Sequence, residues 1–189
     1  MPLWLCALSL AVNYLEQLVA EWYEYQGYFV HRNMLVGPRL KGGYECELGG
    51  VAFNPERKHL VHIPIEPSMD TNTWAERERR YTKKFAAGRK YIPHVFKGLI
   101  LPNDIEQIVV LTFAAKKNHV TLGGGKLVLV EDLLSEIFEA LKTKRIERNS
   151  IPEHWTVLRS FQFVAECQTA VFKTLGSGGL ATRRGSTPY

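Results

Sequence analysis

The sequence predicts an α/β sandwich in which helices flank a mixed central β-sheet. Three observations support this fold class. Strand-like segments follow an amphipathic helix near the amino terminus, and a second amphipathic helix follows them. Two short apolar runs, within residues 106–115 and 126–130, are typical of buried strands. Since strand and helix patterns alternate along the chain, one sheet covered by helices accounts for all of them.

Length and composition favour a single folded body. The chain has 189 residues, of which 46% are hydrophobic, so it can bury one sizeable core. The segment 176–189 is rich in Gly, Ser and Thr, which is typical of a disordered tail. We therefore predict one domain over residues 1–175 and a disordered tail over residues 176–189.

The first predicted helix ends at Gly27, a residue well suited to the position after a helix terminus. Its apolar residues recur at helical spacing: Tyr14, Leu15, Leu18, Val19 and Trp22. The apolar segment 1–12 lacks the basic start of a signal peptide, so we interpret it as the beginning of this helix or an extension of it. Glu16 lies on the polar side of the helix, where a solvated side chain is the plain alternative to a functional one.

Three strands are predicted next, over residues 28–36, 43–53 and 59–68. The turn at residues 54–58 joins the second strand to the third. In the third strand, apolar residues alternate with His62, Glu66 and Ser68, which places those three on the opposite face. Glu47 precedes Gly49 by two positions, so on one strand both would share a face.

A second helix is predicted over residues 73–87, with Gly88 as its stop. Thr73 and Glu76 have the spacing of a capping box. The aromatic residues at helical spacing are expected to pack on the sheet: Trp74, Tyr81 and Phe85. Basic residues form an adjacent stripe: Arg77, Arg80 and Lys84.

The remaining pattern predicts two strands and two helices. The strands cover residues 106–115 and 126–130, and the helices cover residues 133–141 and 160–175. The glycines at positions 123–125 lead into a strand instead of a helix, so they indicate a turn and not a phosphate-binding loop.

The charge indicates the kind of binding partner, and the cysteine content indicates the cellular compartment. The net charge of +5 and the pI of about 9.1 favour an anionic partner such as DNA. Cys6, Cys46 and Cys167 are odd in number and widely spaced, so we interpret them as buried free thiols in a reducing cytoplasm. No run of 18 apolar residues exists, and we expect no membrane span.

The helix bearing Glu16, the two strands joined by a hairpin, and Glu66 at the end of the second strand together resemble the PD-(D/E)XK nuclease superfamily. The resemblance covers roughly residues 13–141 and implies a restriction-endonuclease-like fold. It also implies a Mg²⁺-dependent (or Mn²⁺-dependent) deoxyribonuclease acting in restriction or repair. The chain departs from the family pattern twice: the expected Asp falls at about Gly49, and Ser68 stands where Lys is expected.

The resemblance assigns roles to several residues. Glu66 is the main metal-ligand candidate, and Glu47 would replace the missing Asp, so we expect their carboxylates to converge. Glu16 would support the metal site, and Lys84, or less favourably Lys83, would replace the missing lysine. Independently of the resemblance, basic and aromatic residues interleave along residues 74–91, as in nucleic-acid grooves, and Tyr91 is the candidate for base stacking. The basic residues expected to contact nucleic acid are Arg77, Arg80, Lys83, Arg89 and Lys90.

Other functions stay open at this point. The chain could be a catalytically inactive nucleic-acid-binding subunit of a larger restriction or repair assembly. The chain could also be a protein-interaction module whose basic helix binds an acidic protein. A homodimer or partner subunits are open for each of these functions. A transition-metal or histidine-based site would need His31, His59 and His62, which have no compact metal-binding spacing.

Overall fold

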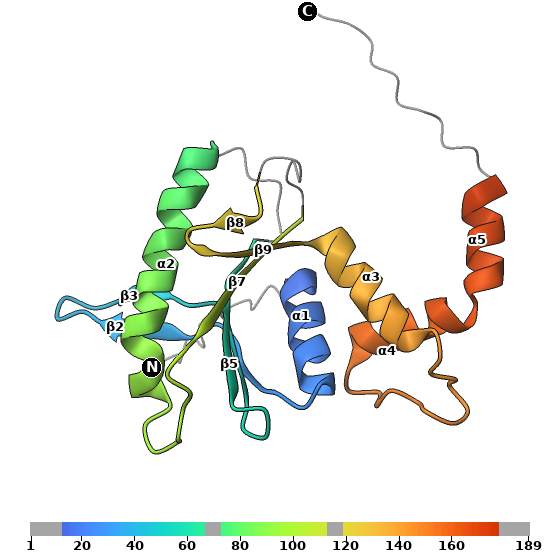
Figure 1. Cartoon of the computed structure of the whole chain (residues 1–189), viewed down its shortest axis with the longest axis horizontal. Coiled ribbons are helices and arrows are strands. Elements are labelled where there is room, and N and C mark those ends of the chain that lie inside the picture. The colour runs from blue at the N-terminus through green and yellow to red at the C-terminus, as the bar shows by residue number, and fades with distance from the viewer. Residues whose placement is uncertain (1–12, 67–72, 113–118, 178–189) are drawn as a thin grey trace, which may run out of the picture. The chain divides into compact units, whose positions relative to one another are not determined.

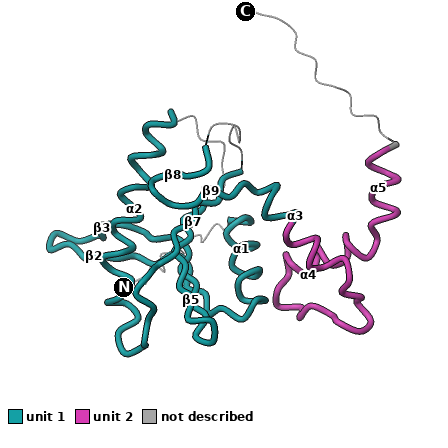
Figure 2. Tube along the Cα trace, viewed as in Figure 1, with its two compact units in different colours: residues 1–135 teal, residues 136–189 magenta. Residues whose placement is uncertain are grey.

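The computed structural model describes residues 13–66, 73–112 and 119–177, and its fold is α/β (Figure 1). By its internal contacts the chain divides into two compact units, residues 1–135 and 136–189 (Figure 2). The single domain over residues 1–175 stays a prediction. The residues 1–12, expected to begin the first helix, lie outside the described part of the chain.

A mixed seven-stranded sheet forms the centre of the first unit, as predicted. Its strands run in the order β1-β4-β5-β7-β9-β8, and β6 also pairs with β7. The pairs β1/β4, β4/β5 and β8/β9 are antiparallel, whereas β5/β7, β6/β7 and β7/β9 are parallel. The strand bounds are β1 Phe29–His31, β4 Gly50–Asn54, β5 His59–Ile63, β6 Ile65–Glu66, β7 Glu106–Leu111, β8 Thr121–Leu122 and β9 Gly125–Leu129.

Two helices cover opposite faces of this sheet (Figure 1). Helix α1 (Tyr14–Tyr25) begins at Asn13, whose side-chain oxygen accepts a hydrogen bond from Leu15 N at 3.1 Å. Helix α2 (Trp74–Val95) begins with the predicted capping box of Thr73 and Glu76. Strand β5 lies between them: Ile63 lines a pocket with α1 residues, whereas the ring of His62 packs against Phe85 of α2.

The predicted strand 28–36 is two strands. Asn33 adopts a φ of 54°, which ends β1 and redirects the chain into β2 (Leu35–Pro38). Strand β2 leaves the main sheet and pairs with β3 (Tyr44–Glu47) in a separate two-stranded sheet. The result is a separate two-stranded ribbon between β1 and β4 in sequence.

The predicted strands 43–53 and 59–68 are also interrupted. Gly49 adopts a φ of +76°, so β3 ends at Glu47 and β4 starts at Gly50. The expectation that Glu47 and Gly49 share one strand face is therefore wrong. Pro64 separates β5 from β6, because proline has no N–H to donate to a neighbouring strand. The hairpin at residues 54–58 is confirmed, with Asn54 paired to His59.

Helix α2 continues past Gly88 to Val95, so Gly88 does not stop it. Tyr81 and Phe85 are buried on the sheet as predicted, and Trp74 is partly buried. Strand β5 was expected to expose one face, but its residues from Leu60 to Ile63 are all buried. A sheet covered by helices on both faces explains this difference.

Three corrections apply to the carboxyl-terminal elements: the strand predicted over residues 106–115 ends at Leu111, β8 was not predicted, and one predicted helix is two. Helix α3 (Val130–Leu141) and the turn at Gly123 and Gly124, both with positive φ, are confirmed. The helix predicted over residues 160–175 is two helices, α4 (Thr156–Glu166) and α5 (Gln168–Ser177), with Cys167 between them. Nothing in the local sequence explains that break. The predicted tail overlaps α5 at residues 176 and 177, and the rest of it lies outside the described residues.

Cys46 and Cys167 are free thiols, as expected, but Cys46 is only partly buried and Cys167 is exposed. Cys6 lies outside the described residues. Within the part of the chain that the structure describes, no helix is both long and apolar enough to span a membrane.

Candidate functional site

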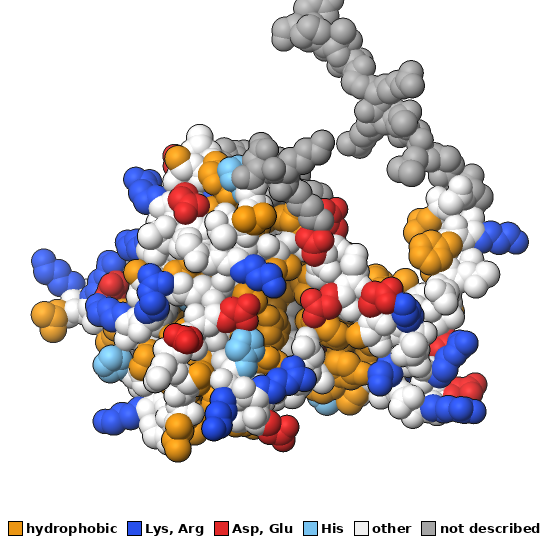
Figure 3. Space-filling model, in the orientation of Figure 1, with side chains coloured by type: hydrophobic (Ala, Val, Ile, Leu, Met, Phe, Trp, Pro, Cys, Tyr) orange, Lys and Arg blue, Asp and Glu red, His pale blue; other side chains and the backbone are white. Residues whose placement is uncertain are grey.

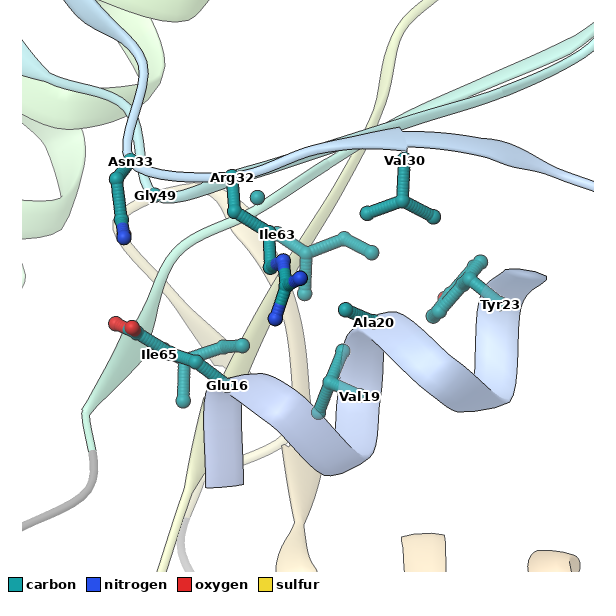
Figure 4. A pocket seen from close by; sticks show the side chains of 11 residues that line it. Glu16, Val19, Ala20, Tyr23, Val30, Arg32, Asn33, Gly49, Ile63 and Ile65 are labelled. Atoms are coloured by element: carbon teal, nitrogen blue, oxygen red, sulfur yellow. The ribbon is translucent and has the colours of Figure 1, made fainter. Parts of the chain in front are cut away.

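A pocket lies between α1 and the strands at the end of the sheet where β4 begins (Figure 4). Its walls are mostly apolar and include Val19, Ala20 and Ile63. The polar side chains of Glu16, Arg32 and Asn33 point into the space between the helix and the strands (Figure 4). An apolar pocket with a few convergent polar groups is the usual form of a ligand or active site.

Glu16 is the titratable centre of this pocket. Partial burial raises the pKa of its carboxyl above 4.5, and repulsion from Glu47 acts in the same direction. A hydrogen bond with Asn13 and attraction to Lys84 and Arg32 oppose the rise. The charges of Glu47 at the end of β3 and of Lys84 in the middle of α2 therefore both act on the pKa of Glu16, although neither residue lines the pocket.

Two local contacts position the first turn of α1. Asn13 caps the helix, which sets the start of the turn that carries Glu16. Arg32, just after β1, donates from Nη1 to Oε1 of Gln17. Gln17 Nε2 in turn donates to Oε1 of Glu21 at 2.6 Å. Arg32 is thereby held beside Glu16 from a different element.

Gly49 lies against Pro64 at the position where the resemblance predicts an Asp carboxylate. Gly50 pairs with Ile63, and a Cβ added to Gly49 would lie 3.2 Å from the Cα of Pro64. Pro64, not Glu66, is thus the residue beside Gly49. The backbone of Glu66 lies two residues further on, paired with Leu111 in β6, and its side chain lies outside what the structure describes. The predicted convergence of Glu47 with Glu66 stays a prediction.

His62 holds the segment between Glu47 and Gly49. Its Nε2–H donates to the carbonyl oxygen of Leu48 at 2.9 Å, and the N–H of Leu48 donates to Met34 O at 2.9 Å. Burial lowers the pKa of His62 from 6.5 to about 4, and the charges of Lys84 and Arg89 add to the decrease. A neutral, buried imidazole therefore fixes the backbone that carries Glu47.

The three histidines do not form one site. His62 faces α2, whereas His59 lies beside Tyr28, whose hydroxyl is 2.6 Å from His59 Nδ1. Nε2 of His59 lies 2.8 Å from Oε2 of Glu106, and His31 is exposed on β1. Among the described side chains, no group of three or more His, Cys, Asp or Glu is arranged to hold a metal ion.

The basic residues of α2 divide into two sets. Arg80 and Lys83 border a surface hollow together with Glu76 and Arg79, and Arg79 lies outside the basic stripe that the sequence pattern predicts. Arg77 is partly buried, and Arg80 lies 5.4 Å from the ring centre of Tyr81.

The second set is engaged within the protein. Arg89 Nη1 donates to Gln107 Oε1 at 2.6 Å, and Lys90 Nζ pairs with Glu45 Oε2 at 3.2 Å. The Tyr91 hydroxyl also donates to Glu45. A stacking role for Tyr91 and nucleic-acid contacts by these basic residues stay predictions.

Arg32 and Asn33 are site residues that the strand pattern concealed. They follow β1 directly, and the left-handed backbone of Asn33 turns them towards α1. Asparagine after an aromatic and β-branched segment was the available signal, since it adopts positive φ more readily than most residues.

Comparisons with known proteins found no match to a family model, to a curated protein or to a solved structure.

Proposed function

We propose that the chain is a metal-dependent deoxyribonuclease of the PD-(D/E)XK type with a restriction-endonuclease-like fold. The observation that supports this function best is that the charges of Glu47 and Lys84 both act on the pKa of Glu16. Two carboxylates and an ammonium from α1, β3 and α2 are the groups that phosphodiester hydrolysis needs. The net charge of +5 is consistent with a polyanionic substrate.

The donor set suits a hard divalent cation. Carboxylate oxygens are the ligands that Mg²⁺ and Mn²⁺ prefer, and Mg²⁺ commonly uses one or two of them while it keeps several waters. Glu16 and Glu47 would hold the ion, and Glu66 is the candidate for a further ligand. When bound, such an ion lowers the pKa of a coordinated water and offsets charge on the phosphoryl oxygens.

The residues of this chain would divide the remaining work. Lys84 would place its ammonium against the negative charge that develops on the phosphate, where a preorganised cation is most effective. Arg32 would orient a phosphate oxygen from the α1 side of the pocket. Arg79, Arg80 and Lys83 would bind the backbone of the flanking DNA.

A second candidate function is a catalytically inactive nucleic-acid-binding subunit of a restriction or repair assembly. It is favoured by the pair of Gly49 and Pro64, which offers no carboxylate where two strands meet at the end of the sheet. In that case the basic residues would bind DNA without cleavage.

Cleavage of plasmid and branched DNA over a series of Mg²⁺ and Mn²⁺ concentrations tests the proposal. We expect stronger activity with Mn²⁺, because Mg²⁺ demands near-ideal octahedral geometry and a site with one displaced ligand does not provide it. Glu66→Ala measures the contribution of the third carboxylate. Salt-sensitive DNA binding without cleavage under any metal would favour the inactive subunit instead.

A further inference from the structure

The ribbon of β2 and β3 is an arm that stands apart from the main sheet (Figure 1). A tight turn over residues 39–43 joins its two strands. Arg39 N donates to Gly43 O at 3.0 Å, and Gly42 N donates to Arg39 O at 3.0 Å. Gly42 and Gly43 both have positive φ, near 87° and 79°, so the turn is compact and defined.

The turn presents an unusual combination of side chains. Arg39, Leu40 and Lys41 are all exposed, and the relative exposure of Leu40 is 108%, the highest among the large hydrophobic side chains that the structure describes. Figure 3 shows basic and hydrophobic side chains together at the end of the ribbon. An apolar side chain this exposed contributes nothing to the core. Only a bound partner could remove it from water.

The root of the arm is anchored to α2, which fixes the direction of the tip. Glu45 of β3 accepts a hydrogen bond from the Tyr91 hydroxyl and pairs with Lys90 at 3.2 Å. Gly37 of β2 has a φ of +68°, and a Cβ there would lie 2.6 Å from the Tyr91 hydroxyl oxygen. Val36 and Cys46 also pack in the hydrophobic cluster that includes Ile92 of α2. The root of the arm thus packs on α2, while Arg39, Leu40 and Lys41 at its tip are exposed.

We propose that this arm enters a groove of duplex DNA, with Arg39 and Lys41 on the phosphates and Leu40 as a wedge against a base step. Two-stranded ribbons fit DNA grooves, and apolar wedges flanked by cations are used to unstack and kink a duplex. The two cations beside Leu40 favour DNA over an apolar protein surface, because burying them in a protein interface would leave their charges to be compensated. The inference rests on DNA binding by the proposed function, and it holds whether or not the site cleaves.

Two variants separate the two roles of the tip. In fluorescence anisotropy with a duplex over a salt series, Arg39→Ala/Lys41→Ala should lower the slope of log K against log [salt] by about 1.8, from two lost phosphate contacts. Leu40→Ser should leave that slope unchanged. It should abolish the fluorescence increase of a 2-aminopurine placed at the contacted step, because the base is no longer unstacked.

Matched controls lie in the second unit. Arg148→Ala/Lys173→Ala makes the same charge change at exposed positions, and Leu175→Ser removes another exposed leucine, which has 70% relative exposure. The tip variants should have the thermal unfolding curve of the wild type. If the wild type binds DNA and the tip variants keep its salt slope and its 2-aminopurine signal, the arm does not enter the duplex, although the proposed DNA binding stands. If Leu40→Ser alters only self-association, the arm docks on protein and the inference also fails. If wild type binds no DNA, the proposed function fails first.

Discussion

Gly88 of α2 leaves the space that the imidazole of His62 occupies. A Cβ at residue 88 would lie 2.3 Å from His62 Nδ1 and 2.6 Å from Cε1, well inside contact distance. This fit places the helix directly on β5, and through the hydrogen bond from His62 to Leu48 it supports the segment that carries Glu47. A glycine that the sequence suggests as a helix stop is therefore a packing residue.

Gly88→Ala should destabilise the protein although alanine is the better helix former. Overpacking of the imidazole should lower the free energy of unfolding by about 2 kcal/mol after the gain in helix propensity. Urea unfolding measures the change. Gly176→Ala in α5 is the control, because a Cβ there meets nothing within 4 Å and should be neutral or stabilising. Equal effects of the two substitutions would contradict the proposed packing.

The stability of the protein should fall between pH 6.5 and about 4 because of His62. The pKa of His62 is about 4 in the folded protein and ordinarily 6.5, so the unfolded state binds the proton more readily. The contribution is complete above pH 6.5 and is lost as the pH falls, by up to about 3 kcal/mol. His62→Gln keeps an N–H donor for Leu48 but cannot titrate.

Urea unfolding of wild type and His62→Gln at pH 7, 5.5 and 4 compares the two slopes. The variant should be less stable at pH 7 but should lose less stability on acidification. His31→Gln, at an exposed histidine, should follow the wild type. If His62→Gln loses as much unfolding free energy as the wild type between pH 7 and pH 4, groups other than His62 cause that loss.

Glu16→Gln should stabilise the fold and weaken the site. The pKa of Glu16 is raised in the folded protein, so its ionised form costs stability above that pKa and costs nothing well below 4.5. The gain should be about 0.5 kcal/mol at pH 7, as is usual for a partly exposed position. Thermal unfolding at pH 7 and at pH 3.5 checks the sign, since the gain should vanish at the lower pH. A gain that is equal at both values would mean that charge is not its cause.

Gly49→Asp should raise Mg²⁺-supported cleavage, but at a cost in stability. The added carboxylate would lie beside the site, yet its backbone must keep a φ of +76° and its Cβ would approach Pro64 Cα at 3.2 Å. Gly49→Asn is the matched control, because it carries the same strain without the charge. Initial rates with Mg²⁺ for both variants decide the point. Faster cleavage by Gly49→Asp alone supports a metal role, whereas no difference between the two variants opposes it.

The sequence predicts the types of most elements but not where several of them break. The hairpin at residues 54–58 and the capping box at Thr73 follow from local chemistry, which short segments encode. The interruptions at Asn33, Gly49 and Pro64 fall inside continuous strand-like patterns and depend on pairing with distant strands. Propensity does not reveal which neighbour a strand will choose.

The candidate site was predictable in part. The resemblance predicts Glu16, Glu47 and Lys84 in one site, and the charges of the last two act on the pKa of Glu16, but the convergence of the three side chains stays a prediction. Arg32 was missed because it joins the pocket only after β1 turns at Asn33. The strand parity used to place Glu47 with Gly49 failed, because the positive φ of Gly49 ends that parity.

The most direct test of the proposed nuclease site is Mn²⁺-supported plasmid cleavage by Lys84→Met beside Lys83→Met. Both substitutions remove one ammonium from α2, but the charge of Lys84 acts on the pKa of Glu16, whereas Lys83 borders the surface hollow with Arg79 and Arg80. We predict that Lys84→Met lowers the cleavage rate by about 100-fold, as expected for a lost preorganised charge, while Lys83→Met mainly reduces the salt slope of DNA binding by about 1. If the wild type cleaves DNA and the two variants cleave it at equal rates, the assignment of Lys84, Glu16 and Glu47 to one catalytic site is contradicted.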